Sequence, residues 1–530
     1  MSFRAHQGHC RSARPFASLL IYGLCCFAVP TASRGDEPES ARRGPNVVLF
    51  LVDDMGWADC GAYGSRYYET PHIDALADRG MLFTDAYAAN PLCSPTRASI
   101  LTGKYPARLG LTSASGHKPP RPADAPRYPA SAARSRKTIQ PHSLNYLAPE
   151  EYTLAEALRD AGYATGHFGK WHLGLMPRHW PEQQGYDVAW HGAPDPGPGG
   201  ANGYFSPYSF KTGTIEPAEK EGAYIVDHLT DEACKFIEAN RDRPFLVSVW
   251  QFGVHGPWDH KEEYTRQFVD KVDPTDRQAN PVMASMLKSV DESLGRIVER
   301  LDELGLTDNT IILFTSDNGG NIHSNIESDS TKEKVKPGHP RWRSLESYRR
   351  YAGFLPPTSN APLRDGKGRL YEGGVRVPLI ICWPGHVSAG TRSSEIASSI
   401  DFYPTLLELA GVAPREGVRF DGISLAQVLR NPPARLDREA VFNFSPHGGP
   451  GRPPGVTVRQ DHLKLIRWFE TGPGNPSEFE LYDLASDIGE TTNLADERPE
   501  DVRRLDGLID GFLDDTGALV PKPNPAYRPR

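Results

Sequence analysis

Acidic and amide side chains stand directly after two apolar runs, where they could bind a metal ion. Asp53 and Asp54 end the first run, and Asp317 and Asn318 follow another. Taken singly, an Asp after a strand is commonly explained by a turn or a helix cap. Together, three carboxylates and one amide form a hard-oxygen set that suits Ca²⁺ or Mg²⁺ better than zinc. Such an ion would polarise an anionic oxygen and help to activate a nucleophile.

Basic side chains follow other segments of the same kind. Lys170 and His172 come after one predicted strand, His255 after another, and Lys367 lies in a glycine-containing loop. Each alone is explained as a surface lysine or a structural histidine. Together with the carboxylates they describe a metal-assisted site for a tetrahedral oxyanion, at which Lys and His neutralise charge and move protons.

Strands and helices alternate along most of the chain and would bring these side chains together. Helices are predicted from Thr153 to Asp160, which starts at a Thr-x-x-Glu capping pattern, and over the apolar repeat that runs from Leu287 to Leu304. This alternation predicts a doubly wound, mostly parallel α/β sheet, in which ligands bind at the carboxyl ends of the strands. The predicted buried strands cover residues 46–52, 163–168, 245–250, 310–315 and 378–383.

The pattern changes near Glu439 to short alternating segments, among them 462–469 and 479–483. Such segments predict a small antiparallel sheet. We therefore expect a catalytic domain over residues 46–437 and a smaller C-terminal α+β domain over residues 438–530.

Composition excludes several classes of protein. The chain has 530 residues, of which 38% are hydrophobic and 24% charged, so it is neither disordered nor a coiled coil. Its 59 Lys and Arg against 67 Asp and Glu give a net charge of -8. No chain-wide basic field therefore indicates nucleic-acid binding.

The first residues have the layout of a secretory signal. Arginines precede an apolar run over residues 16–29, and small residues follow it. The run is shorter than the roughly 20 residues of a membrane-spanning helix. We expect a signal peptide over residues 1–34 and a linker over 35–45, with an uncleaved anchor or a buried helix as alternatives. After signal removal no transmembrane span is expected, and the chain would be secreted or periplasmic. Four cysteines would remain after signal removal, and their spacing is typical of neither a disulfide framework nor a metal site: Cys60, Cys93, Cys234 and Cys382.

Two polar stretches interrupt the predicted elements. Residues 117–137 are rich in Lys, Arg and Pro, with Asp124 as their one acidic residue. This basic loop is either a solvated insertion or a rim that attracts an anionic substrate. Residues 321–360 form a second polar insertion, which could border the same site.

The segment Cys93-Ser94-Pro95-Thr96-Arg97 resembles the C-x-P-x-R signature of type I sulfatases, in which the Cys is oxidised to formylglycine. The resemblance extends through Gly169–Gly174, Thr315–Gly319 and Lys367–Gly374, and covers about residues 46–493. It implies the fold of the alkaline phosphatase-like superfamily. Within the family, the chain resembles arylsulfatases and N-acetylgalactosamine-6-sulfatase-like enzymes.

The resemblance also implies roles for the residues. Asp53, Asp54, Asp317 and Asn318 match the ligands of one calcium ion, and Cys93, as a hydrated formylglycine beside that ion, would supply the hydroxyl that attacks sulfur. Arg97 would hold the hydrate, and Lys170 and Lys367 would bind the sulfate oxygens. His255 would protonate the leaving alcohol or bind near it. His172 would take the proton that lets sulfate depart and restores the aldehyde. A maturation enzyme that generates formylglycine is the implied partner.

The sequence says less about which alcohol carries the sulfate ester of the substrate. Gly203-Tyr204-Phe205 and the basic loop resemble substrate-side segments of sulfatases that act on sugars, although Gly203–Phe205 is also explained by loop packing. The prediction is a sulfatase for a sulfated carbohydrate, with an aryl sulfate as the other substrate class. The alternatives are a phosphomonoester or phosphonate hydrolase of the same superfamily and a non-catalytic protein that binds sulfated glycans.

Overall fold

The computed structural model describes residues 44–122, 125–193, 195–324, 326, 335–448, 452–470 and 478–528. The predicted signal peptide lies outside these ranges, as does most of the predicted linker. Of the helices in the described part of the chain, none has both the length and the apolar character that a membrane span requires.

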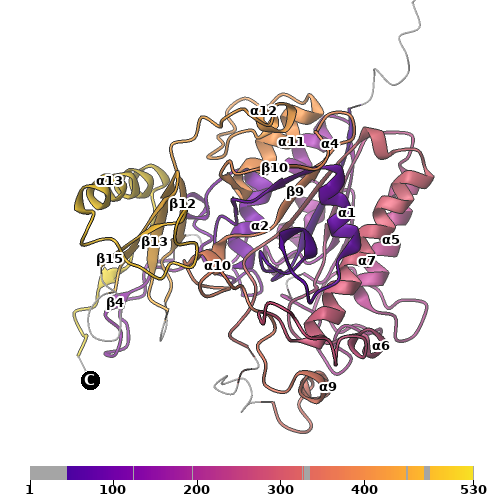
Figure 1. The fold of residues 1–530 in the computed structure, drawn as a ribbon, viewed down its shortest axis with the longest axis horizontal. Helices are drawn as coiled ribbons and strands as arrows, with labels where there is room; N and C mark the ends of the chain where they lie inside the picture. Colours follow the sequence, from indigo (N-terminus) through magenta and orange to yellow (C-terminus); the bar gives the residue numbers. More distant parts are fainter. Residues whose placement is uncertain are drawn as a thin grey trace, which may run out of the picture. The chain divides into compact units, whose positions relative to one another are not determined.

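An eight-stranded, mostly parallel sheet forms the centre of the chain, as the sequence predicts (Figure 1). The parallel pairs include β1 with both of its neighbours, β7 and β8, and β5 with β7, whereas β9 runs antiparallel to β8. In spatial order the strands are β10 (Thr391–Ser393), β2 (Met81–Phe83), β9 (Leu379–Cys382), β8 (Thr310–Ser316), β1 (Asn46–Val52), β7 (Phe245–Trp250), β5 (Ala164–Gly169) and β6 (Val188–His191).

Helices cover both faces of this sheet because its central strands are apolar on both sides. All seven residues of β1 are buried, with alternate side chains in two hydrophobic cores. One core includes α1 (Pro71–Arg79), α5 (Ile225–Ala239) and α7 (Pro281–Glu303). The other includes α2 (Cys93–Thr102), α4 (Leu154–Asp160), α11 (Phe402–Ala410) and α12 (Ala426–Arg430).

Local signals explain where the helices begin. Thr153 and Glu156 form the predicted capping box of α4. Asn280 caps α7, which ends at Glu303, just before the predicted stop at Gly305. Shorter helices are α3 (Pro106–Leu109), α6 (Glu262–Thr265), α9 (Trp342–Ala352) and α10 (Glu372–Val375).

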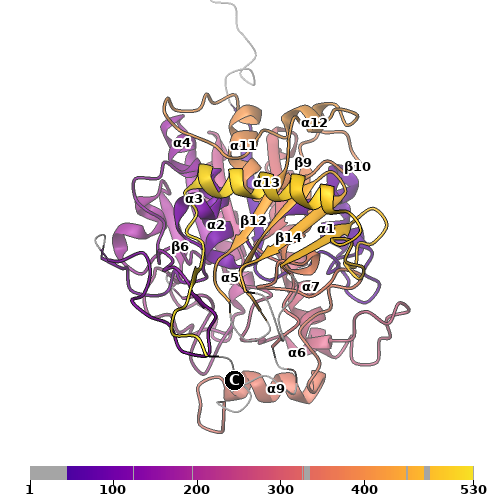
Figure 2. The same ribbon diagram turned by 90° about the vertical axis from the view of Figure 1, so that its left-hand side faces the viewer.

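A four-stranded antiparallel sheet near the C-terminus confirms the second predicted sheet. Figure 2 shows α13 (Pro499–Thr516) lying across it, and apolar side chains of the helix and the sheet share one core. Its strands in order are β12 (Val441–Ser445), β13 (Gly455–Gln460), β14 (Leu463–Trp468) and β15 (Phe479–Asp483). Because Gly44–Arg530 forms one compact unit, the domain boundary at 437/438 stays a prediction.

Small two-stranded pairings connect distant segments. β4 (Thr138–Ile139), directly after the basic loop, pairs with β16 (Lys522–Pro523). Tyr128 in that loop also donates a hydrogen bond to the Val520 carbonyl at 2.8 Å. The loop therefore packs on the C-terminal part of the chain. A second pairing joins β3 (Ala86–Tyr87) to β11 (Ala397–Ser398).

Candidate active site

The carboxyl ends of β1 and β8 bring the predicted oxygen donors together. Val52 pairs with Ser316, so the residues that follow each strand are neighbours. The Asp54 amide lies 3.2 Å from Asp317 Oδ1, and Asn318 Nδ2 lies 2.9 Å from Asp54 Oδ1. These acidic and amide side chains and that of Asp53 are buried. Sheet register alone therefore gathers the four side chains.

Cys93 is the first residue of α2 and points at this cluster. Its Sγ lies 3.6 Å from Asp53 Oδ1, and every residue of the helix is buried. Burial raises the pKa of the Cys93 thiol to about 12, and the nearby Asp317 acts in the same direction. An unmodified thiol here stays protonated near neutral pH and is a poor nucleophile.

Arg97 lies one turn after Cys93 and is fully buried. Its Nη2 lies 2.7 Å from Asp317 Oδ2 and 3.7 Å from Asp53 Oδ1, and its Nη1 donates to the Lys170 carbonyl at 2.8 Å. Burial acts to lower the pKa of Arg97, but Asp317 and Asp53 raise it overall. Arg97 therefore links α2 to the ends of three strands.

Two lysines complete the charge balance. Lys170 Nζ lies 2.5 Å from Asp53 Oδ2, and Lys367 Nζ lies 2.6 Å from Asp54 Oδ1. Burial tends to raise the pKa of Asp54, yet Lys367 and His255 hold it well below its usual range. With Arg97, the lysines place three basic side chains against the three carboxyl groups. Burial nevertheless raises the pKa of Asp53 to about 7, against the effect of Lys170.

Two histidines flank the cluster and differ in exposure. His255 Nε2 lies 3.8 Å from Asp54 Oδ2, and 22% of its side chain is exposed. Burial, then Lys367 and Lys170, lowers the pKa of His255 to about 3. His172 is buried, and burial together with Lys170 and His117 holds its pKa well below the usual value. Both imidazoles are therefore neutral near pH 7.

The carboxylate and amide oxygens of the cluster fit a hard divalent cation. Ligand atoms of Asp53, Asp54, Cys93 and His255 all lie within 4.8 Å of one another. Asn318 Oδ1 is buried and has no hydrogen-bond partner among the described residues, although its Nδ2 is bonded. A buried amide oxygen without a hydrogen-bond partner, beside a group of carboxylates, is available to bind a cation.

Two residues near the cluster are not among the predicted catalytic and metal-binding residues. His117, in the basic loop, lies with its Nδ1 2.9 Å from His172 Nε2. Tyr204 is fully buried, and its hydroxyl donates to the His255 carbonyl at 2.6 Å. The sequence signal for Tyr204 was the Gly203–Phe205 segment, which contributes buried packing beside His255. For His117 the sequence offered only its place in a basic loop.

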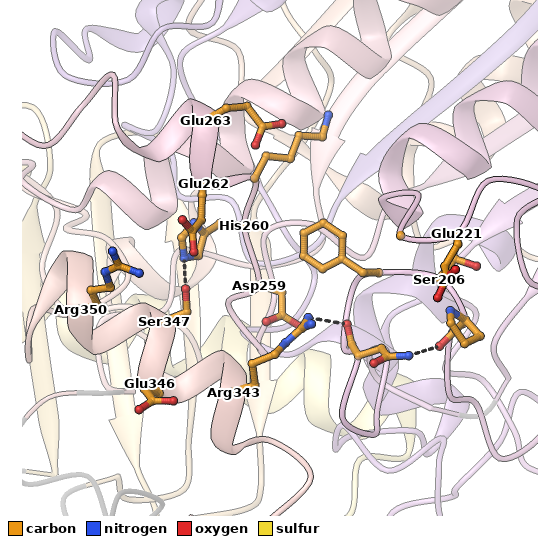
Figure 3. A pocket seen from close by; sticks show the side chains of 15 residues that line it. Ser206, Glu221, Asp259, His260, Glu262, Glu263, Arg343, Glu346, Ser347 and Arg350 are labelled. Carbon is orange, nitrogen blue, oxygen red and sulfur yellow. Dashed lines mark hydrogen bonds between the residues drawn. The ribbon is translucent and has the colours of Figure 1, made fainter.

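Two hollows lie on opposite faces of α9. The smaller, of about 210 Å³, is lined by His255, Trp258, Asn321, Arg341 and other residues, so the insertion 321–360 does border the site. The larger, of about 910 Å³, contains none of the predicted site residues. Figure 3 shows it, with His260 directed at Ser347. The hollow of about 210 Å³ is therefore the one placed to receive the rest of a substrate.

Family models match most of the chain. The model described as sulfatase matches residues 45–412. A second, described as the C-terminal part of N-sulphoglucosamine sulphohydrolase, matches residues 365–505. The two matches overlap across the Lys367 loop, so together they span both sheets.

Individual relatives agree with the family models. Human N-acetylgalactosamine-6-sulfatase is 31% identical over 414 residues, which are 76% of this chain and 69% of that protein. A sulfatase of Formosa agariphila is 30% identical and covers 92% of this chain and 90% of its own. Among solved structures, Ps i-CgsB in complex with k-i-k-neocarrahexaose is 25% identical, with a TM-score of 0.68 over 89% of this chain and 93% of that one.

Proposed function

The chain belongs to the sulfatase family, has its alkaline phosphatase-like fold and hydrolyses sulfate esters; from this premise we propose that it does so with a formylglycine made from Cys93 and one calcium ion, on sulfated carbohydrates. The observation that supports the proposal most directly is the place of Cys93. Its Sγ stands at the start of a buried helix, 3.6 Å from Asp53, among side chains that can bind both a cation and an anion.

Formylglycine and calcium would supply chemistry that the unmodified chain lacks. Formylglycine at position 93 would provide a hydrated aldehyde, whose hydroxyl attacks sulfur in place of a buried thiol with a pKa of about 12. Calcium, held by Asp53, Asp54, Asp317 and Asn318, would polarise the sulfate oxygens.

The cations of the cluster would bind and orient the reacting groups. Arg97, held by Asp317 and the Lys170 carbonyl, is positioned to fix the side chain of residue 93. Lys170 and Lys367 would bind sulfate oxygens, since both ammonium groups lie at the carboxylates that face the site. Because these cations are preorganised, and Arg97 and Lys170 are fully buried, they would stabilise developing negative charge without reorganisation.

The two histidines would move protons at different steps. His255 is partly exposed and borders the hollow of about 210 Å³, so it would protonate the leaving alcohol. His172 is buried and lies next to His117, so it would accept the proton that lets sulfate depart and pass it to that second ring. The low pKa of His172 keeps its ring neutral and ready to accept a proton, whereas His255 would first have to gain a proton, which a bound sulfate beside it would favour, before it could donate one to the alcohol.

The substrate class follows from the relatives and the hollow beside His255. The human relative is named for a sulfated amino sugar, and Ps i-CgsB was solved with a neocarrahexaose. In this chain the hollow combines an aromatic side chain, Trp258, with the polar Asn321 and Arg341. Aromatic and polar side chains together suit a sugar ring, which has apolar faces and a hydroxylated edge.

Two further expectations complete the proposal. A formylglycine-generating enzyme would have to act on the segment from Cys93 to Arg97, which is buried in the folded protein, so conversion would precede folding. The chain would be secreted or periplasmic, as its first residues predict.

One experiment tests the activity and the modified residue together. Peptide mass spectrometry on active enzyme should show residue 93 lighter than cysteine by the difference between H2S and O. Defined sulfated sugars should release inorganic sulfate, and Cys93→Ala should not. Full activity with only the thiol present would contradict the formylglycine assignment. Faster release of phosphate from matched phosphate esters would favour a phosphohydrolase, and binding without release a non-catalytic glycan-binding protein.

A further inference from the structure

An arginine from the C-terminal part of the chain lies against the loop that carries Lys367. Arg452 lies three residues before the start of β13 at Gly455, and its Nη1 lies 2.7 Å from the position that a Cβ on Gly368 would take. Gly368 has φ +81 and no side chain, which permits this approach. Gly368 is next in sequence to Lys367, which contacts Asp54 at 2.6 Å. Arg452 therefore lies against the residue that follows a member of the catalytic cluster.

The surroundings of Arg452 are positively charged. Within the described ranges, no carboxylate forms an ion pair with Arg452 and no hydrogen bond to its side chain is present. Burial and the neighbouring Arg369 lower the pKa of Arg452. Burial, then Arg452 and Lys118, lowers the pKa of His447 to about 4. Arg369 is paired with Asp365 at 3.4 Å, but no ion pair between a described carboxylate and Arg452 or Lys118 is present, so an anion that joined these two cations would lower the free energy of the protein.

The basic loop contributes the second cation and is held in place. His117 contacts His172 at 2.9 Å, so the adjacent, exposed Lys118 lies at the edge of the active site. Further along, Arg136 Nη1 donates at 2.7 Å to the carbonyl of Gly448, which is close in sequence to Arg452. The loop is therefore fixed to the segment that presents Arg452.

We propose that Arg452 and Lys118 form a second anion-binding subsite, which receives another anionic group of the same glycan while the scissile sulfate occupies the catalytic cluster. This assignment rests on the proposed function, because it names the class of carbohydrate that the site takes. The group is a second sulfate ester or a carboxylate, whose oxygens a guanidinium binds in pairs. Substrates are accordingly polyanionic glycans.

Binding can be measured without turnover in a Cys93→Ala background. Isothermal titration would use three disaccharides on one sugar backbone: one with a single sulfate ester, one with two, and one with a sulfate ester and a carboxylate. We expect one of the dianionic sugars to bind about tenfold more tightly than the monosulfate, the gain that one charged hydrogen-bonded contact supplies. The dianionic sugar that binds more tightly shows whether the second anionic group is a sulfate ester or a carboxylate.

Substitutions at the subsite should remove that advantage. Arg452→Gln should bring the affinity ratio of the dianionic to the monosulfated sugar close to one, and Lys118→Gln should lower it less. Arg452→Lys, which keeps the charge but not the paired donors, should give an intermediate ratio and guards against a folding defect in the glutamine variant. Arg503→Gln, at a side chain that is 75% exposed, is the matched control and should leave the ratio unchanged.

The outcomes separate this inference from the proposed function. An unchanged ratio in Arg452→Gln, or no advantage for either dianionic sugar in the parent, overturns the subsite. If the enzyme with Cys93 intact releases sulfate from these sugars in that case, the proposed function still stands. If it releases none while Arg452-dependent binding persists, the function fails and the subsite stands.

Discussion

His117 Nδ1 lies 2.9 Å from His172 Nε2, and the two rings stack with centroids 5.2 Å apart. His172 is buried, while His117 is partly exposed and belongs to the basic loop. The pair therefore connects the interior of the candidate site with its edge. A hydrogen bond to one nitrogen of an imidazole fixes which nitrogen carries the proton and how the ring is turned.

His117→Ala should lower kcat about tenfold with little change in KM, since it removes the partner that orients His172 and accepts its proton. Steady-state kinetics on a sugar sulfate would measure the two constants. Added imidazole should restore part of kcat, because it can occupy the space of the lost ring. His117→Gln, which keeps a hydrogen-bonding side chain, should be impaired less. A rise in KM alone would show that His117 only binds substrate.

The proposed division of labour between the histidines predicts different responses to the leaving group. His255→Ala should slow sugar sulfates, whose alcohols need a proton, far more than activated aryl sulfates. His172→Ala should slow both classes by a similar factor of about 100 or more, because its step does not involve the alcohol. Plots of kcat/KM and kcat against leaving-group pKa test this. Equal slopes for the two variants would contradict the assignment.

Much of this site follows from local patterns in the sequence. The strands β1, β5, β7 and β8 overlap the predicted strand segments, and parallel pairing places the residues after them at one edge. Asp53, Asp317 and Lys170 are close for that reason alone. The Thr153 capping box is likewise a purely local signal.

Other relationships have no local signal. His117 and His172 are separated by 55 residues, and Arg452 meets Gly368 across the boundary between the two sheets. Both contacts depend on how irregular loops fold back, and such loops have no periodicity to read. Asp54 and His172 also have positive φ values of 67° and 60°. Asp and His adopt such values more readily than most residues, but which of them do so depends on the surrounding structure.

Calcium removal should lower the thermal midpoint of the protein, because an ion that binds the folded chain and not the unfolded one stabilises the fold. Metal analysis should find one ion per chain, and returning calcium after chelation should restore the midpoint. Asn318→Ala should weaken calcium binding, since it removes a buried oxygen while Arg97 keeps both of its carboxylate partners. Asp317→Asn is a less clean test, because it also removes the nearest partner of Arg97. Unchanged calcium affinity in Asn318→Ala would exclude Asn318 as a ligand.

A buried charge cluster joins the Lys367 loop region to the C-terminal sheet and should make stability depend on pH. Lys464 Nζ of β14 lies 2.9 Å from Glu372 and 2.8 Å from Glu490, and the three residues are buried. Burial raises the pKa of Glu490 from 4.5 to about 7, against the effect of Lys464 and helped by Glu372. The folded protein thus holds a proton that the unfolded chain has already lost within this range.

Stability supplied by Glu490 is accordingly complete below pH 4.5 and lost as pH rises through about 7. Glu490→Gln is neutral at every pH and should lack this loss, so its free energy of unfolding should improve relative to the parent between pH 5 and pH 7.5. Urea denaturation at both pH values measures the difference. Glu416→Gln, at an exposed site, is the control and should show no such trend. If the free energies of unfolding of the parent and of Glu490→Gln change equally between pH 5 and pH 7.5, the Glu490 carboxyl does not take up a proton on folding.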